Sequence, residues 1–148
     1  MPVIAAVNGP ALIHAEIAVL SDIVIASENT EYQDAPRFPN GVVPGDGVHI
    51  VWPLVLGINR GRYFLLTGQK LSAGEAQRLG VVSEVVPRDR LLSRAREIAE
   101  EIVKKPTLAT RYGRVALTQQ LKRAMLDNLG YGLALEGLGA LSAAAARG

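Results

Sequence analysis

The sequence contains no cysteine among its 148 residues. This absence excludes disulfides, thiol catalysis and zinc–thiolate sites, and it is typical of a reducing compartment, so we expect a cytoplasmic protein. Aromatic residues are also scarce, at 5% of the chain. Leucine, valine, isoleucine and alanine are therefore expected to fill most of the core.

The sequence also lacks a strong charge of one sign and a long hydrophobic run, and its first residues do not have the pattern of a signal peptide. Its net charge of +2 is too small to indicate a nucleic-acid or membrane partner. Glu16, Asp22 and Glu28 interrupt the apolar N-terminal region, which stays below the ~18–20 apolar residues that a membrane span requires. The start "MPVIAAVNGP" has no basic segment before its apolar run.

Basic residues gather in one late segment, residues 105–123, where only Tyr112 supplies an aromatic ring between them. They are Lys105, Arg111, Arg114, Lys122 and Arg123. This pattern is typical of a solvated helix face more than of a nucleic-acid surface. The sequence contains no P-loop, dinucleotide fingerprint or metal-ligand cluster, so we expect no cofactor and no metal.

What remains is a composition of 49% hydrophobic and 20% charged residues, typical of a globular chain of one-domain size. The apolar segments at residues 3–7 and 22–27 indicate buried strands, and a short helix is expected over residues 11–20 between them. This order favours parallel strands in a βαβ unit. Further along, the pattern predicts helices at 47–57, 59–69 and 71–80, the last with a Ser72–Glu75 capping box, a strand at 81–87, and helices from 88 onward.

Four segments, in this order and spacing, resemble the crotonase (enoyl-CoA hydratase/isomerase) superfamily: "IAAVNGPAL", "SDIVIASENTEYQDAP", "GVVPGDG" and "GRYFLLTGQKLSAGEAQRLGVVSEVVP". Within it, "NRGRYFLLTGQ" and "VPGDG" are most similar to β-diketone hydrolases of the 6-oxocamphor hydrolase type, which cleave a carbon–carbon bond. The resemblance implies an α/β fold of the ClpP/crotonase type, a spiral of ββα turns followed by helices that pack into homo-oligomers, trimers or hexamers. We expect residues 1–87 to form the C-terminal part of that spiral core and residues 88–148 to form the helical oligomerisation region. Full members carry a substantial region before "PVIAAVNGP", so the chain is expected to be N-terminally truncated.

The resemblance also bears on the oxyanion hole, the pair of backbone N–H groups that holds a thioester or ketone oxygen as it becomes an enolate. Full members take one donor from the N-terminal region and the other from a glycine-rich turn. Here that turn reads "ALIHAEI", with Ile13 and His14 in place of glycines. This substitution argues against a CoA-thioester site of the usual kind.

Four positions correspond to the active site of the β-diketone hydrolases in this resemblance, and three of them keep the residue type. His14, Asp46 and Glu136 match a histidine, an aspartate and a glutamate there, whereas Arg37 replaces the histidine that pairs with the aspartate to activate water. Arginine stays charged in proteins and cannot accept a proton from water, although it can hold an enolate or an anion. A structural histidine at position 14 and a simple Arg37–Asp46 salt bridge are the alternatives.

Glu16 matches the first catalytic glutamate of the enoyl-CoA hydratases, and the second one would fall at Arg37. Hydration needs two carboxylates, one holding water as base and one delivering the proton, so half of that pair is missing. A capped or solvated helix glutamate is the alternative. On the helix after the loop, His49 and Trp52 are neighbours at i and i+3, and we expect Trp52 to pack in the core and His49 to lie on the surface.

Three functions follow from these residues. The first is a crotonase-fold hydrolase or lyase of a small β-dicarbonyl compound, in which His14 is the base, Glu136 positions it or water, and Arg37 holds the enolate. The second is an enoyl-CoA hydratase or isomerase that uses Glu16 on an acyl-CoA. The third is a non-catalytic homologue that persists as an oligomerising or binding module.

Overall fold

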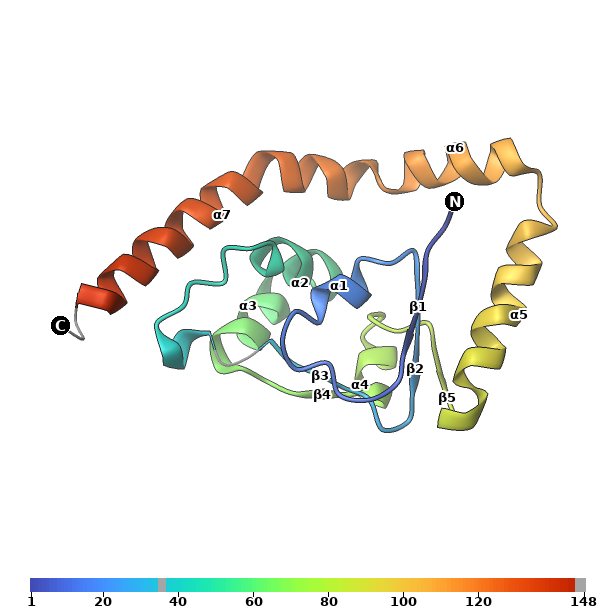
Figure 1. Cartoon of the computed structure of the whole chain (residues 1–148), viewed down its shortest axis with the longest axis horizontal. Coiled ribbons are helices and arrows are strands. Elements are labelled where there is room, and N and C mark those ends of the chain that lie inside the picture. Colours follow the sequence, from blue (N-terminus) through green and yellow to red (C-terminus); the bar gives the residue numbers. More distant parts are fainter. Residues whose placement is uncertain (35–36, 146–148) are drawn as a thin grey trace.

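The computed structural model describes residues 1–34 and 37–145 and is built around a three-stranded sheet (Figure 1). Its strands are β1 (Ile4–Val7), β2 (Ile23–Ser27) and β5 (Glu84–Val86), in the order β1-β2-β5. Both pairs are parallel, with Ile4 opposite Ile23 and Ile25 opposite Glu84. The parallel strands expected from the apolar segments are confirmed, and β1 forms an edge of this sheet.

The connection between β1 and β2 differs from the expected helix over residues 11–20. Only α1 (Glu16–Val19) is helical. Ala11 is held in extended pairing beside β3 (Glu31–Tyr32), because its N–H donates to the Glu31 carbonyl at 2.8 Å and its carbonyl accepts from the Gln33 N–H at 3.0 Å. His14 then turns the chain through a positive φ of 54°. The prediction was wrong because this long-range pairing overrides local helix preference.

The other predicted elements before residue 88 are confirmed, with bounds shifted by a few residues. Ser72 Oγ accepts the Glu75 N–H at 3.3 Å, and Glu75 Oε2 accepts the Ser72 N–H at 2.9 Å, which is the expected capping box. The strand β4 (Leu71–Ser72) pairs antiparallel with β3. The helices are α2 (Val48–Leu56), α3 (Ile58–Thr67) and α4 (Ala73–Arg78), with short 3₁₀ turns at Phe38–Asn40 and Arg88–Arg90.

The main core lies between the sheet and helices α1 to α4, and its few aromatic side chains are central to it. Tyr32, Trp52 and Phe64 are at most 1% exposed. The rings of Trp52 and Phe64 have centroids 4.4 Å apart. Aliphatic residues fill the remaining volume, as expected from the composition, so these aromatic rings hold α2 and α3 against the strands.

Three helices follow β5: α5 (Leu91–Val103), α6 (Thr107–Leu117) and α7 (Gln119–Ala145). α5 covers the sheet on the side opposite α1 to α4, where Leu91 and Ile98 pack on Ile25 of β2 (Figure 1). α6 and α7 then run back across the molecule above α1 and α2, and Arg114 of α6 donates to Asp22 at 2.7 Å. The boundary between a spiral core and an oligomerisation region at residue 87 stays a prediction. Residues 146–148 lie outside the described residues.

Within residues 1–34 and 37–145, no helix combines the length and the apolarity needed to cross a bilayer. The long helix α7 includes charged side chains such as Lys122 and Asp127 along its length.

Candidate active site

The acid–base residues converge where the segment before α1 meets the loop between β3 and α2. His14 lies two residues before the start of α1, and its Nδ1 is 2.9 Å from Oε1 of Glu16, the first residue of that helix. The same Nδ1 is 3.6 Å from Oδ2 of Asp46, from the loop before α2. The imidazole is half-exposed and the Glu16 side chain is only 6% exposed. The cluster therefore presents a histidine at the surface with a buried carboxylate behind it.

Arg37 lies beside this pair and is bound by two carboxylates. Its Nε donates to Asp34 Oδ1 at 2.7 Å and its Nη1 donates to Asp46 Oδ2 at 2.8 Å. Burial acts to lower the pKa of the guanidinium, but the hydrogen bonds that it donates to Asp34 and Asp46 outweigh burial and raise the pKa. Arg37 is thus a fixed cation, and the ion pair expected between Arg37 and Asp46 is present.

The sequence interpretation missed Asp34, a fully buried carboxylate that organises the cation. Its Oδ1 accepts from Arg37, and its Oδ2 accepts from the indole Nε1 of Trp52 at 3.2 Å. Trp52 is fully buried as predicted, but it also positions a charged group. The signal in the sequence was the acidic residue three positions before Arg37, a spacing that allows a local ion pair.

The pKa values of His14 and Glu16 are both raised, but by different causes. The hydrogen bond to Glu16 raises the pKa of the His14 imidazole despite the opposing effect of partial burial. Burial raises the pKa of the Glu16 carboxyl, and the hydrogen bond from His14 opposes that rise. A histidine with a raised pKa is a stronger base, and an imidazole is suited to proton transfer.

Glu136 reaches the same loop from the other end of the chain. It lies on α7, where its Cβ would be 2.9 Å from a methyl group placed on Gly45, the neighbour of Asp46. Its Oε2 is buried and has no hydrogen-bond partner among the described residues. The structure therefore brings His14, Glu16, Arg37 and Asp46 into direct contact and places Glu136 beside them against the loop backbone.

The expectation that His49 lies on the helix surface is wrong. His49 is half-buried on α2, with its Nε2 3.4 Å from the Asn128 carbonyl of α7. A methyl group on Gly132 would overlap its imidazole. His49 is therefore packed under α7, which the local sequence of α2 cannot indicate.

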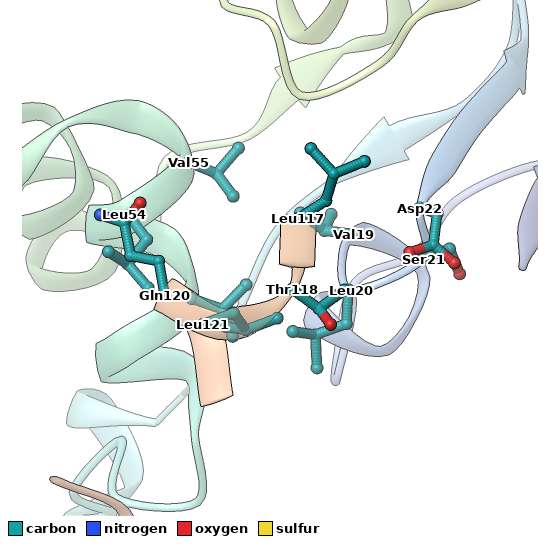
Figure 2. Close-up of a pocket in the computed structure, with 11 residues that line it drawn as sticks. Val19, Leu20, Ser21, Asp22, Leu54, Val55, Leu117, Thr118, Gln120 and Leu121 are labelled. Atoms are coloured by element: carbon teal, nitrogen blue, oxygen red, sulfur yellow. The ribbon is translucent and has the colours of Figure 1, made fainter. Parts of the chain in front are cut away.

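Two pockets lie near these elements but differ in chemistry. One, of about 340 Å³, is lined by the end of α1, by α2 and by the α6–α7 junction (Figure 2). Asp22 is the only ionisable residue among those that line it, and Arg114 pairs with that carboxylate at 2.7 Å. The other, of about 260 Å³, includes Asp34 and Arg37 and extends to the end of α3. The first pocket contains none of the predicted site residues, so the acid–base cluster is the better candidate site. No group of three potential metal ligands occurs in the described part of the chain.

Comparison with known proteins identifies the family. The enoyl-CoA hydratase/isomerase family model matches residues 1–136. A solved β-diketone hydrolase from the cyanobacterium Anabaena sp. PCC 7120, bound to (S)-3-oxocyclohexyl acetic acid, is 56% identical with a TM-score of 0.93, covering 99% of this chain and 58% of that one. A solved enoyl-CoA hydratase from Mycobacterium tuberculosis is 33% identical with a TM-score of 0.89, covering 99% of this chain and 64% of that one.

Among curated relatives, a short-chain-enoyl-CoA hydratase from Clostridium acetobutylicum is 36% identical over 136 residues, or 91% of this chain and 50% of the relative. The chain thus spans about half the length of that relative. The similarity covers both the sheet and the C-terminal helices, and the expected crotonase-type α/β fold is confirmed. The chain belongs to the enoyl-CoA hydratase/isomerase family, within the crotonase superfamily.

Proposed function

We propose that this chain is a hydrolase of the crotonase superfamily that cleaves a carbon–carbon bond of a β-diketone. The observation that carries the proposal is the contact of His14 with Glu16 at 2.9 Å, with Asp46 3.6 Å from the same imidazole nitrogen. The 56% identity to a β-diketone hydrolase supports it. Because the chain covers 58% of that protein, its activity is inferred from its own residues and not from the relative alone.

The reaction is a retro-Claisen cleavage by water. His14 takes a proton from water, and the resulting hydroxide adds to one carbonyl carbon of the diketone. When the tetrahedral oxyanion collapses, the bond to the central carbon breaks and its electron pair passes into the enolate of the second carbonyl. The imidazolium then returns the proton to that carbon, so the products are a carboxylic acid and a ketone. Glu136 positions His14 or the attacking water.

Arg37 stabilises the enolate in this scheme, although most of its charge is already balanced by neighbouring carboxylates. Two carboxylates already engage its Nε and Nη1, whereas Nη2 lies 3.4 Å from His14 Nδ1 and pairs with no carboxylate among the described residues. A guanidinium held in a fixed orientation stabilises negative charge that develops in the transition state. It does not add a free positive charge that would attract an anion in the ground state.

The charge of the cluster favours an uncharged substrate. The cluster contains four carboxylates and two basic side chains. The carboxylates belong to Glu16, Asp34, Asp46 and Glu136, and the basic groups are the guanidinium of Arg37 and the imidazole of His14. A substrate with a carboxylate next to the scissile bond would meet a net negative site. A neutral cyclic diketone avoids this repulsion.

The second candidate is an enoyl-CoA hydratase or isomerase, which the names of the curated relatives favour. It requires Glu16 to work with a second carboxylate, but the matching position is Arg37, a permanent cation. The deciding experiment compares turnover of a neutral cyclic β-diketone with turnover of crotonyl-CoA on one preparation. Cleavage of the diketone alone supports the proposal, hydration of crotonyl-CoA alone overturns it, and absence of both supports a non-catalytic module.

A further inference from the structure

Glu16 differs from the other carboxylates of the cluster because its contact with the imidazole is direct and buried. Its Oε1 lies 2.9 Å from His14 Nδ1, and its Oε2 is buried with no hydrogen-bond partner in the described part of the chain. A glutamate that activates water must present an oxygen to that water. Glu16 presents one oxygen to His14 and has the other enclosed by protein.

We propose that Glu16 is the positioning residue of His14: its carboxylate accepts the Nδ1–H and thereby leaves Nε2 as the basic nitrogen that faces substrate. This role rests on the proposed function of His14 as the base. It assigns to Glu16 the part that an aspartate plays behind the histidine of hydrolytic triads, where it fixes the tautomer and stabilises the imidazolium. Glu136 is then left to position the attacking water.

The other charged groups near Nδ1 are less suited than Glu16 to accept the Nδ1–H. Asp46 Oδ2 is farther away, at 3.6 Å, and already accepts from Arg37 Nη1 at 2.8 Å. Arg37 Nη2 lies 3.4 Å from Nδ1, but a guanidinium can only donate hydrogen bonds. Nδ1 cannot accept a hydrogen bond from Arg37 while Nδ1 itself carries the proton that it donates to Glu16. Glu16, at the start of α1, is therefore the carboxylate best placed to orient His14.

The backbone supports the same arrangement. His14 adopts a φ of 54°, a left-handed conformation that non-glycine residues adopt infrequently. The turn at His14 lets the side chains at positions 14 and 16 meet across one intervening residue, Ala15, which is buried in the core. Strained residues of this kind gather at functional sites, because the surrounding structure must hold them.

Electrostatics add to the geometry. The hydrogen bond to Glu16 is the main cause of the raised pKa of His14, and the charge of Asp46 raises it further while that of Arg37 lowers it. These groups, from α1 and from the loop before α2, are the charged neighbours of the imidazole. Replacing Glu16 by an uncharged residue therefore removes the largest stabilising contribution to the imidazolium.

The test uses NMR titration of the imidazoles, because the chain has only two histidines, His14 and His49. In the wild type, the ¹⁵N shifts of neutral His14 are expected to report the Nδ1–H tautomer. Glu16→Gln is expected to lower the titration midpoint of His14 and leave that of His49 unchanged. The matched control is Glu136→Gln, an equivalent substitution at the site's other glutamate, which is expected to leave the His14 midpoint near its wild-type value.

Kinetics provide the second readout. Glu16→Gln is expected to lower kcat on a cyclic β-diketone by at least ~100-fold, because the amide N–H can donate to Nδ1 and place the proton on Nε2. The acidic limb of kcat/KM is expected to move to lower pH in the residual activity. An Nε2–H tautomer in the wild type, or an unchanged His14 midpoint in Glu16→Gln, overturns the positioning role. If Glu16→Gln shifts the His14 midpoint but the wild type cleaves no diketone, the positioning role of Glu16 is retained and the proposed function is overturned.

Discussion

Gly132 of α7 packs directly on the backbone of Gly45 in the loop before α2. A methyl group on Gly45 would overlap the Gly132 carbonyl oxygen, and one on Gly132 would lie 2.5 Å from the Gly45 carbonyl oxygen. This contact sets the position of α7 relative to Asp46, which follows Gly45. Because Glu136 is one helical turn beyond Gly132, it also places that carboxylate beside the cluster.

We expect Gly132→Ala to destabilise the protein. The added methyl group would overlap the His49 imidazole and the loop backbone at Gly45, so these groups or α7 must shift, and overpacking of this kind costs about 1–3 kcal/mol. The control is Gly130→Ala on the same helix, where a methyl group would meet open space and is expected to add about 0.5–1 kcal/mol of helix stability. Urea unfolding of both variants measures the difference, and equal stabilities contradict the packing described.

The sequence predicted the elements whose signals are local. Two apolar runs indicated the parallel strands, and Ser72 with Glu75 indicated the start of α4. It failed where distant segments meet: the pairing of Ala11 with Tyr32 shortened the helix expected before β2. At the site, the resemblance gave five residues that the structure places together. The spacing of Asp34 and Arg37 is a local signal for their ion pair, whereas the burial of Asp34 against Trp52 and the contact of Gly45 with α7 depend on folding back of the chain and have no local signature.

Arg37→His tests whether the loss of a histidine at this position limits diketone cleavage. The new imidazole would stand next to Asp46 and form a histidine–aspartate pair, so turnover of a cyclic β-diketone is expected to rise, and to rise with pH as that imidazole loses its proton. Buried Asp34 loses its cationic partner in this variant, so the folded fraction must be measured alongside the rate. A folded variant with no higher turnover than the parent contradicts the prediction.

The Asp22–Arg114 pair is expected to make stability depend on pH in the acid range. Burial acts to raise the pKa of Asp22, but the hydrogen bonds from Arg114 and from the Val3 N–H outweigh it and lower the pKa. A carboxyl whose folded pKa is lowered adds stability above its unfolded pKa, about 3.9, and loses it as the pH falls through the folded pKa.

The stability advantage of the wild type over Asp22→Asn is therefore expected to be full near pH 6 and to shrink below about pH 4. Chemical denaturation at a series of pH values measures it. Asp89→Asn, at an exposed position, serves as the control. A difference between wild type and Asp22→Asn that is constant from pH 6 to pH 2 contradicts the role given to this pair.

Self-association is expected from the exposed leucines of the late helices. Leu117 and Leu126 are 85% and 84% exposed, and β1 forms an edge of its sheet in the described chain. Covering such surfaces favours an oligomer, which we expect to be a trimer or a multiple of three. Light scattering at micromolar concentration measures the mass, and Leu126→Glu is expected to weaken the assembly. A stable monomer in the wild type rules out this expectation.

The most direct test of the account is the paired rate and melting temperature of His14→Asn. Asparagine tolerates the positive φ at this position, so the substitution removes the base while the backbone conformation is retained. General acid–base groups contribute about 10²–10⁴-fold, and kcat on a cyclic β-diketone is therefore expected to fall by at least ~100-fold, with the melting temperature within a few degrees of the wild type. A large fall in melting temperature with unchanged activity of the folded fraction would contradict the account, because His14 would then be structural and Glu16 or Glu136 would have to supply the base.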